Sequence, residues 1–439
     1  MTNLWFGKTT TKWPVVPLRE VASLGTGHTP SRSVAEYWQN CTIPWVTVDD
    51  IRKHGPWSLE PLMQTGQKIS ELGLENSAAV VHPEGTVMLS RTASIGFSCV
   101  IGKPMATTQA FVCWTPNPRM VDSDYLHAAV KAMGQKYDQL SYGATHLTIY
   151  FPDIKTLRVP CPPLEVQKHI ATFLKRELAK IESLISEQQN LIDILQEKRQ
   201  AVISHAVTKG LNPDAPTKPS GVEWLGEVPA HWDVTRVGWT LTKISYGYTN
   251  PMPTEDDGPF LLTANDIAMG HVQYESARRT SREAFDTLLT AKSRPKKGDI
   301  LLTKDGTLGR VAIHDGSDAC INQSVALLRP KASTVSSGFL VYLLMGGIYQ
   351  ARMIYEAGGT AIKHIYISRL AKMPLALPPQ SEQQQILDFL RESTERFDGV
   401  IEECETSITL LEQRRNALIS AAVTGKIDVR NRSADEAVA

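Results

Sequence analysis

The stretch Leu195-Gln-Glu-Lys-Arg-Gln-Ala-Val-Ile-Ser-His-Ala-Val-Thr208 returns, partly changed, as Leu411-Glu-Gln-Arg-Arg-Asn-Ala-Leu-Ile-Ser-Ala-Ala-Val-Thr424. The same offset of 216 positions relates residues 162–208 to residues 378–424 without a gap. A large block precedes each copy, so the chain is one unit of block plus helix used twice. A duplicated molecule is suited to a target that itself has two parts. The repeat therefore favours two half-sites over one active-site cleft.

Both repeated stretches have the apolar rhythm of a coiled coil. The first helix is predicted to start after Pro162-Pro163 and to run to about Val207. The positions expected to form the seam are Leu174, Leu178, Ile181, Ile185, Gln188, Ile192, Leu195, Arg199 and Val202, and then Leu390, Thr394, Phe397, Ile401, Cys404, Ile408, Leu411, Arg415 and Leu418. A heptad pattern of this length predicts a coiled coil, although two separate amphipathic helices are the alternative. Since Arg199 and Arg415 fall on the seam, we expect each to meet an acid across the coil.

The order of the chain sets the direction of the helices. A short Pro-rich linker, residues 209–220, joins the end of the first helix to the second block, and that block leads into the second helix. The end of one helix and the start of the other therefore lie near the same block. If the helices pair, they pair antiparallel, and the duplication then predicts a pseudo-two-fold arrangement.

The two blocks are predicted to be mixed α and β, which places the whole chain in the α+β class. In the first block we expect strands at 43–48, 86–90 and 110–114 and a helical segment at 124–140. In the second we expect strands at 260–264, 299–303 and 325–328 and a helix near 339–355. Glycine and polar loops recur in matched order, but the sequence between them differs almost completely. A duplicated scaffold with divergent loops is what binding two different sequences requires.

Composition indicates a globular protein of the cytoplasm. The six cysteines are scattered without a C-x-x-C pair, which is typical of a reducing compartment and argues against a metal ribbon. The start of the chain lacks the pattern of a secretory signal. The net charge is zero, but residues 1–160 and 221–376 each have a net charge of +2, and the acidic excess lies in residues 377–439. Any affinity of the lone chain for DNA should therefore be modest and sensitive to salt.

Four segments of the chain have a recognisable pattern. The two longest are Gly221-Val-Glu-Trp-Leu-Gly-Glu-Val-Pro-Ala-His-Trp-Asp-Val234 and Arg415-Asn-Ala-Leu-Ile-Ser-Ala-Ala-Val-Thr-Gly-Lys-Ile-Asp428. The other two are Gly27-His-Thr-Pro-Ser31 and the start of the second helix at Pro379. In these segments, and along nearly its whole length, the chain resembles the DNA-specificity subunit of type I restriction-modification systems.

The resemblance implies an architecture of two target-recognition domains joined by two long helices. The expected parts are a first recognition domain at 1–160, a first helix at 161–208, a linker at 209–220, a second recognition domain at 221–376, a second helix at 377–425 and a tail at 426–439.

The resemblance also implies a role. The subunit binds an interrupted, asymmetric sequence of double-stranded DNA, one half-site per domain. It recruits two methylation subunits, which methylate adenine, and restriction subunits. S-adenosylmethionine, ATP and Mg²⁺ are bound by those partners, so this chain is expected to be a non-catalytic subunit without a cofactor, a metal or a membrane partner.

The sequence agrees with a non-catalytic role, because neither a phosphate-binding loop nor a methyltransferase motif is present. The candidate DNA contacts are polar or basic residues on the matched loops, and each has the plain alternative of a solvated surface residue. In the first domain they are Thr29, Ser31, Arg32, Arg91, Thr92, Ser94 and His146. In the second domain they are Tyr248, Asn250, Lys304, Thr307, Arg310, Lys363 and His364. Asp305-Gly306-Thr307 is interpreted as a turn, not as a metal site.

Three alternatives stay open. The chain could be a coiled-coil scaffold whose blocks bind protein, or an enzyme such as a nuclease with an unrecognised site. It could also be the specificity subunit of a complex that only methylates.

Overall fold

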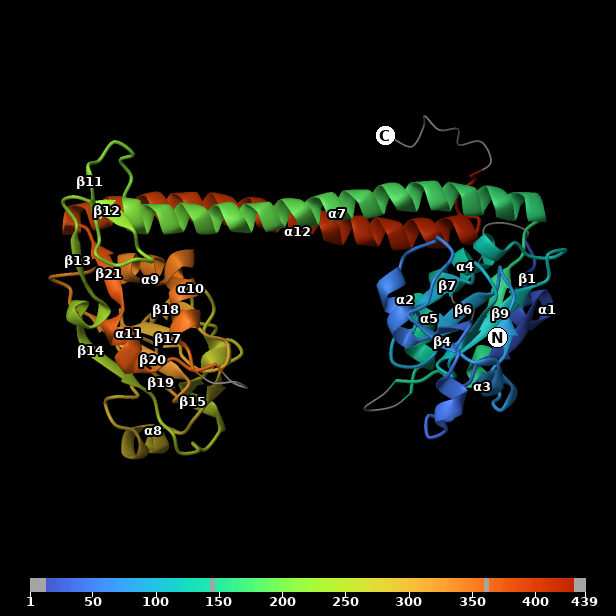
Figure 1. Ribbon diagram of the computed structural model, residues 1–439, viewed down its shortest axis with the longest axis horizontal. Coiled ribbons are helices and arrows are strands. Elements are labelled where there is room, and N and C mark those ends of the chain that lie inside the picture. Colours follow the sequence, from blue (N-terminus) through green and yellow to red (C-terminus); the bar gives the residue numbers. More distant parts are fainter. Residues whose placement is uncertain (1–12, 143–146, 359–362, 430–439) are drawn as a thin grey trace. The chain divides into compact units, whose positions relative to one another are not determined.

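The computed structural model describes residues 13–142, 147–358 and 363–429. It divides the chain into one unit of Met1–Gln188 with Thr406–Ala439, and a second unit of Gln189–Glu405. Both boundaries fall inside the long helices, α7 (Leu164–Lys209) and α12 (Gln380–Val423). Each unit therefore contains part of each helix, drawn green and red in Figure 1.

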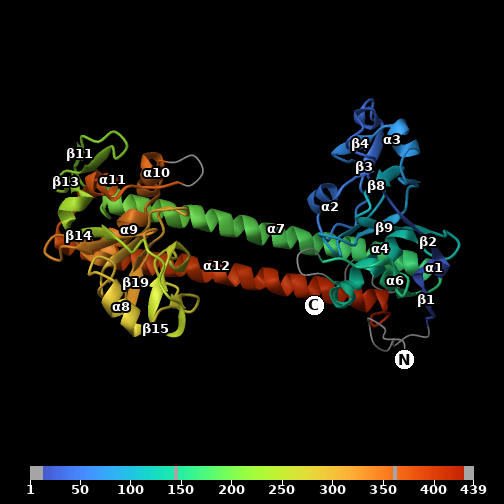
Figure 2. The same ribbon diagram turned by 90° about the horizontal axis from the view of Figure 1, so that it is seen from below.

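The two helices run antiparallel within each unit. In the first unit the start of α7 lies beside the end of α12, and Ile170 and Ile419 share one buried cluster. In the second unit the end of α7 lies beside the start of α12, where Ile203 and Ile386 share another (Figures 1 and 2). This direction confirms the argument from chain order.

The seam predicted from the heptads is the buried face of both helices. Each of the eighteen seam positions named above is buried or half-buried. Leu174, Leu390 and Cys404 are 0%, 0% and 5% exposed. The coiled coil is thus confirmed, and the alternative of two unpaired amphipathic helices is wrong.

The two arginines on the seam each meet an acid on the other helix, as predicted. Arg199 Nε lies 2.8 Å from Asp398 Oδ1 in the second unit. Arg415 Nη1 lies 2.7 Å from Glu182 Oε1 in the first, and its guanidinium stacks 4.0 Å from the centre of the Trp57 ring. The offset of 216 positions relates these two ion pairs to each other, so the repeat extends to the contacts between the helices.

The first unit holds two four-stranded sheets, with the orders β2-β9-β6-β7 and β4-β3-β8-β5, and the pair β1-β10. β3 and β8 are parallel and the other pairings are antiparallel. Its elements before α7 are β1 (Val15–Pro17), α1 (Leu18–Val21), β2 (Ala22–Thr26), η1 (Ala35–Trp38), β3 (Ile43–Val46), α2 (Val48–His54), β4 (Gln67–Ile69), α3 (Glu71–Glu75), β5 (Val81–His82), β6 (Val87–Ser90), β7 (Ser98–Val100), β8 (Met105–Thr107), β9 (Phe111–Pro116), α4 (Ser123–Ala132), α5 (Gly134–Leu140), α6 (Phe151–Ile154) and β10 (Arg158–Pro160).

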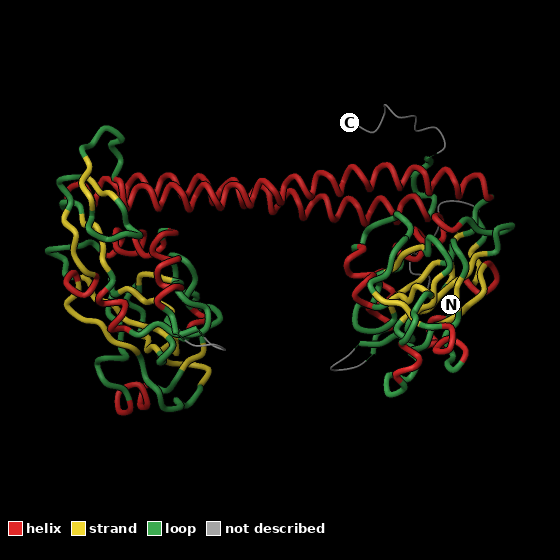
Figure 3. The backbone as a smooth tube through the Cα atoms, viewed as in Figure 1, coloured by secondary structure: helices red, strands yellow, loops and turns green. Residues whose placement is uncertain are grey.

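The second unit repeats this plan with β14-β20-β17-β18, with β16-β15-β19 and with the pair β13-β21 (Figure 3, yellow). β15 and β19 are parallel, like β3 and β8. A two-stranded ribbon, β11-β12, is added after α7. Its elements before α12 are β11 (Thr217–Pro219), β12 (Glu227–Pro229), β13 (Asp233–Arg236), η2 (Val237–Thr240), β14 (Leu241–Tyr246), β15 (Glu255–Leu262), η3 (Ala264–Asp266), β16 (Arg278–Arg279), α8 (Arg282–Leu288), β17 (Ile300–Thr303), β18 (Val311–Ile313), β19 (Ala319–Ile321), β20 (Val325–Pro330), α9 (Ser337–Met345), α10 (Gly347–Glu356), α11 (Ile367–Lys372) and β21 (Pro374–Leu377).

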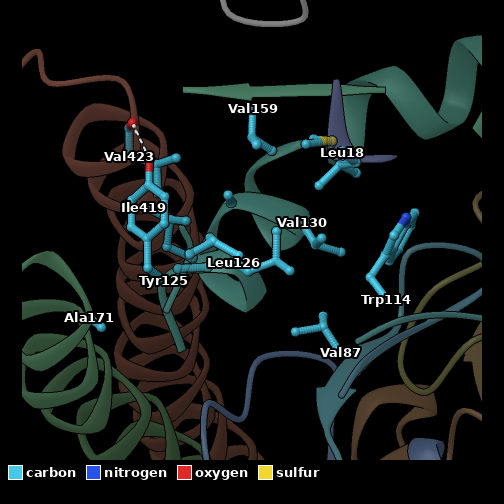
Figure 4. Close-up of a cluster of buried hydrophobic side chains, with 14 of the residues drawn as sticks. Leu18, Val87, Trp114, Tyr125, Leu126, Val130, Val159, Ala171, Ile419 and Val423 are labelled. Atoms are coloured by element: carbon cyan, nitrogen blue, oxygen red, sulfur yellow. Dashed lines mark hydrogen bonds between the residues drawn. The ribbon is translucent and has the colours of Figure 1, made fainter. Parts of the chain in front are cut away.

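The core of the first unit lies between its antiparallel sheet, α4 and the two long helices (Figure 4). Trp114 on β9 and Leu126 on α4 are 1% and 0% exposed. Tyr125 on α4 points toward the end of α12, where its hydroxyl lies 3.4 Å from the carbonyl oxygen of Val423 while it donates to the nearer carbonyl of Pro160 at 2.8 Å (Figure 4). Burial of these large side chains ties the recognition block to the coil.

A buried glutamine near the start of each long helix makes the same attachment in both units. Gln167 on α7 accepts a hydrogen bond from the backbone N–H of Asp122 at 2.8 Å. Gln383 on α12 accepts one from the backbone N–H of Ser336 at 3.0 Å. Asp122 and Ser336 are the N-caps of α4 and α9. Each long helix is thus fixed to its block through the start of a buried helix.

Each of the two helical segments predicted in the blocks is in fact broken into two helices. The first break is at Met133, between α4 and α5, and the second at Gly346, between α9 and α10. At the second break the freed backbone N–H of Gly347 donates to Ser204 Oγ on α7 at 2.7 Å. The contact with the long helix compensates for the lost helical bond, and sequence periodicity does not report such a contact.

Candidate nucleic-acid interface

One polar turn has the same backbone course in both units. It joins β6 to β7 in the first and β17 to β18 in the second. Gly96 and Gly309 have φ of 87° and 84°, and three residues earlier Ala93 and Gly306 have φ of 62° and 73°. Positive φ is costly for side chains other than glycine, so Ala93 keeps this conformation because the surrounding turn imposes it.

In the first unit a distant loop is bound to this turn. Thr92 forms an isolated β-bridge with Thr148, and the backbone N–H of Ile149 donates to the carbonyl of Arg91 at 2.9 Å. Arg91 Nε donates to the carbonyl of Gln109 at 3.2 Å. The turn, the loop after α5 and the start of β9 are thereby joined into one polar surface.

The guanidinium of Arg91 lies partly inside this surface. It stacks 5.0 Å from the centre of the Phe151 ring, and burial lowers its pKa from the ordinary value. Thr29 belongs to the same place, because its hydroxyl donates to Gln109 Oε1 at 2.7 Å. Ser94 is 7% exposed and accepts a hydrogen bond from Arg52 Nε at 2.7 Å. Thr29, Arg91, Thr92 and Ser94, predicted separately, are therefore neighbours.

Two other predicted residues of the first unit form a separate group. The guanidinium of Arg32 lies 4.8 Å from the centre of the Trp38 ring, and Trp38 Nε1 donates to the carbonyl of Ser31 at 3.1 Å. Ser31 and Arg32 are exposed, and both lie in the segment that follows β2. His146 lies outside the described residues.

In the second unit the matching turn is built around a carboxylate. Asp305 forms an isolated β-bridge with His364, and its side chain pairs with the His364 ring. Lys304 Nζ lies 2.9 Å from Asp305 Oδ2 and is 6% exposed as a residue. The backbone N–H of Ile365 donates to the carbonyl of Lys304 at 3.0 Å. Because Lys304 is buried and ion-paired with Asp305, its expected role is to position Asp305 and not to bind a phosphate.

The other candidates of the second unit differ in how open they are. Lys363 is exposed, and its carbonyl accepts a hydrogen bond from the Gly306 N–H at 3.1 Å. Thr307 and Asn250 are exposed, and Arg310 is half-buried, with its backbone N–H bonded to Thr303 Oγ1 at 3.0 Å. The turn therefore presents Lys363 and Thr307 to solvent.

Tyr248 lies two residues beyond the end of β14, where its backbone is hydrogen-bonded on both sides. Its backbone N–H donates to the carbonyl of Ile321 at 3.0 Å, and its carbonyl accepts from the N–H of Gln323 at 2.8 Å. Burial raises the pKa of its hydroxyl to about 12, so the phenol stays protonated near neutral pH. The residue before it, Gly247, has room for no side chain, since a Cβ would lie 1.7 Å from the Ile321 carbonyl oxygen.

The sequence interpretation missed two residues of these surfaces. Asp305 occupies the turn that the sequence predicts, but its contacts with Lys304 and His364 also make it the centre of a polar cluster. Arg52 donates to Ser94 from 42 positions away, and the sequence pattern does not mark it. Neither contact has a local sequence signal. The sequence offers one indirect clue to these surfaces. The matched polar dipeptides Thr108-Gln109 and Asn322-Gln323 recur in both blocks.

The described residues contain no group of three or more histidine, cysteine, aspartate or glutamate side chains arranged to hold a metal ion. Among the same residues, no helix is both long and apolar enough to span a bilayer.

Comparison with known proteins gives a consistent result. The model of a family described as type I restriction modification DNA specificity domain matches residues 10–193 and 268–406. The type I restriction enzyme MjaIX specificity subunit of Methanocaldococcus jannaschii is 23% identical over 436 residues, covering 96% of this chain and 95% of that protein. The MjaVIII specificity subunit of the same organism is 22% identical over 397 residues, covering 88% and 90%.

A solved structure shares the fold. It comes from work on the structural basis of complex assembly and conformational transition of the type I R-M system, and it matches with a TM-score of 0.73 at 16% identity. The match covers 96% of this chain and 100% of that one. Because the family model spans more than half of the sequence, the chain belongs to the family of type I restriction-modification DNA specificity subunits.

Proposed function

We propose that this chain selects the DNA target of a type I restriction-modification complex by binding a bipartite, asymmetric sequence, one half-site per recognition domain. One observation carries the proposal. The two units share a backbone framework, but the side chains on it differ, with Thr92 and Thr148 in one and Asp305 and His364 in the other. A shared framework with different polar side chains suits two different half-sites, because bases are distinguished by side-chain donors and acceptors.

The chain acts without chemistry of its own in this proposal. Two methylation subunits dock on it, bind S-adenosylmethionine and methylate adenine, and restriction subunits bind ATP and Mg²⁺. The contribution of this chain is to place those partners on the DNA. The family membership and the duplicated coil support this role, since a repeated unit offers two equivalent positions for two copies of a partner.

Exchange of one block tests the assignment. Residues 1–155 are replaced by the matching block of a relative with a known target, and the variant is expressed with its methylation subunits in a host that lacks the wild-type chain. Methylome sequencing should show one half of the methylated motif changed and the other half retained. The reciprocal exchange of residues 221–372 is the matched control and should change the opposite half. A change in both halves, or in neither, would refute one domain per half-site.

A further inference from the structure

A pair of equivalent tyrosines stands beside the polar turn in the two units. Tyr150 and Tyr366 are related by the repeat offset of 216 positions, and they are 54% and 56% exposed. Each is the N-cap residue of a short helix, α6 in the first unit and α11 in the second. Although the sequence between the helical repeats has diverged almost completely, this exposed aromatic residue is the same in both.

The backbone holds both tyrosines in fixed positions. The residue before each is a buried isoleucine, Ile149 at 0% exposure and Ile365 at 1%. The N–H groups of these isoleucines donate to the turn carbonyls of Arg91 and Lys304 at 2.9 and 3.0 Å. An exposed ring on an anchored backbone loses little conformational entropy when it binds a partner.

Each tyrosine also lies near a basic residue of the turn or its loop. In the first unit Arg91 Nη1 donates to the carbonyl of Ile149 at 3.4 Å, one residue before Tyr150. In the second, the exposed Lys363 lies three positions before Tyr366, whose ring meets the His364 ring edge-on at 4.5 Å. Neither tyrosine hydroxyl has a hydrogen-bond partner among the described residues.

We propose that Tyr150 and Tyr366 are equivalent DNA contacts that bind the sugar-phosphate backbone of their half-sites and not a base edge. This inference rests on the proposed function. A residue that is identical in both domains cannot distinguish two different half-sites, but it can bind the phosphates that all duplexes share. Tyrosine hydroxyls are among the common donors to DNA phosphates, and such contacts fix the register of the protein without adding sequence information.

The same reasoning assigns sequence discrimination to the positions that differ. Thr92 corresponds to Asp305 and Thr148 to His364. Each pair is joined by an isolated β-bridge, and Thr148 and His364 precede the shared tyrosines by two residues. The contacts of Tyr150 and Tyr366 with the sugar-phosphate backbone would hold each half-site at the same distance from its turn. The divergent side chains would then meet the bases.

The test replaces only the hydroxyls. Tyr150→Phe, Tyr366→Phe and the double variant are assembled with the methylation subunits. Their affinities are measured for the target duplex and for one with both half-sites scrambled. Since a net hydrogen bond contributes about 1 kcal/mol, each single variant should bind both duplexes about 3- to 10-fold more weakly. The double variant should show about the product of the two losses, because the sites are independent. The methylated motif and the slope of affinity against salt should stay unchanged, because no charge is removed.

Tyr355→Phe is the matched control. Tyr355 is 77% exposed, but it is packed against the Arg352 guanidinium at 4.8 Å and is not one of the repeated tyrosines. This variant should bind like wild type. Unchanged affinity of the Tyr150 and Tyr366 variants, a loss confined to the target duplex, an altered motif, or an equal loss in the control would each overturn the assignment. A wild-type complex that fails to prefer the target duplex would instead remove the proposed function itself.

Discussion

Lys131 on α4 carries its ammonium group into the interior of the first unit. It is 5% exposed, and its Nζ donates to the carbonyls of Pro56 at 2.7 Å and Ser98 at 3.2 Å. Burial lowers the pKa of Lys131 to about 7 from the ordinary value of 10.5, and the nearby Arg415 acts in the same direction. Within the described part of the chain its hydrogen-bond acceptors are carbonyls and not carboxylates, so the folded unit holds its proton weakly.

This lysine should make the stability of the first unit depend on pH. The folded pKa lies below the unfolded one, so between about pH 7 and pH 10.5 the unfolded chain binds the extra proton. The free energy of unfolding should therefore rise with pH in this window, by at most about 1.4 kcal/mol per pH unit from this one group, and level off below pH 7.

The measurement compares wild type with Lys131→Met by denaturant unfolding at several pH values from 7 to 10. Methionine is unbranched, is shorter than lysine by one heavy atom, and does not titrate. The difference in unfolding free energy between the two proteins should shift in favour of wild type as the pH rises. A difference that stays constant over this range would mean that Lys131 keeps an ordinary pKa.

At the same scale, the polar surfaces show what a sequence can reveal about a site. The matched turns and their glycines were visible because the repeat aligned them. The partners of the turn residues were not, because Asp305 and His364 are 59 positions apart and meet only through the fold. Lys304 illustrates the consequence. The sequence marks it as a basic loop residue, but its neighbour Asp305 and its burial decide what it can contact.

At the scale of the element, the long helices were predictable because a heptad pattern acts at every turn. The expected end at Val207 was short of the observed end at Lys209 by two residues, which is ordinary fraying of a boundary. The breaks at Met133 and Gly346 were missed. The break at Gly346 is accompanied by a contact with a distant segment, the bond from Gly347 to Ser204, and local periodicity carries no trace of such a contact.

The two seam ion pairs should differ in strength although the repeat makes them equivalent. The Arg415 side chain is 4% exposed and its partner Glu182 is 42% exposed, whereas Arg199 and Asp398 are 21% and 56% exposed. Neutralising Glu182 therefore leaves a more deeply buried arginine, Arg415, than neutralising Asp398 does, which leaves Arg199. Glu182→Gln should therefore cost about 1–2 kcal/mol of unfolding free energy and Asp398→Asn less than about 1 kcal/mol.

Thermal or denaturant unfolding of the two single variants measures this difference, and each variant is the other's control because the chemistry of the change is the same. Hydrogen exchange should place the larger loss in the end of α12 beside Trp57, where Arg415 stacks. Equal costs, or a larger cost for Asp398→Asn, would show that burial of the arginine does not set the strength of the pair.

At the scale of the whole molecule, the duplication links the contacts of the coil to the reading of DNA. The seam arginines and the buried glutamines Gln167 and Gln383 recur in both copies of the repeat, while the side chains on the matched polar turns differ. Selection on two half-sites would produce this distribution, since the framework must stay the same while the contacts change. In this proposal the coil has a further role, because its length would set the number of base pairs between the half-sites.

Lengthening the coil tests that role. One heptad is inserted after Leu184 in α7 and one after Val400 in α12, positions that the repeat makes equivalent. A heptad keeps the seam in phase, and the two insertions lengthen both helices equally while keeping the pairs Arg199–Asp398 and Glu182–Arg415 in register. Seven residues add about 10 Å at 1.5 Å per residue. Duplex DNA rises about 3.4 Å per base pair, so the unspecified gap in the methylated motif should grow by up to about three base pairs. Insertion into one helix alone is the control and should abolish activity by breaking the register. Methylome sequencing reads the gap directly. A folded, active double-insertion variant that still methylates at the original gap would show that α7 and α12 do not determine the spacing.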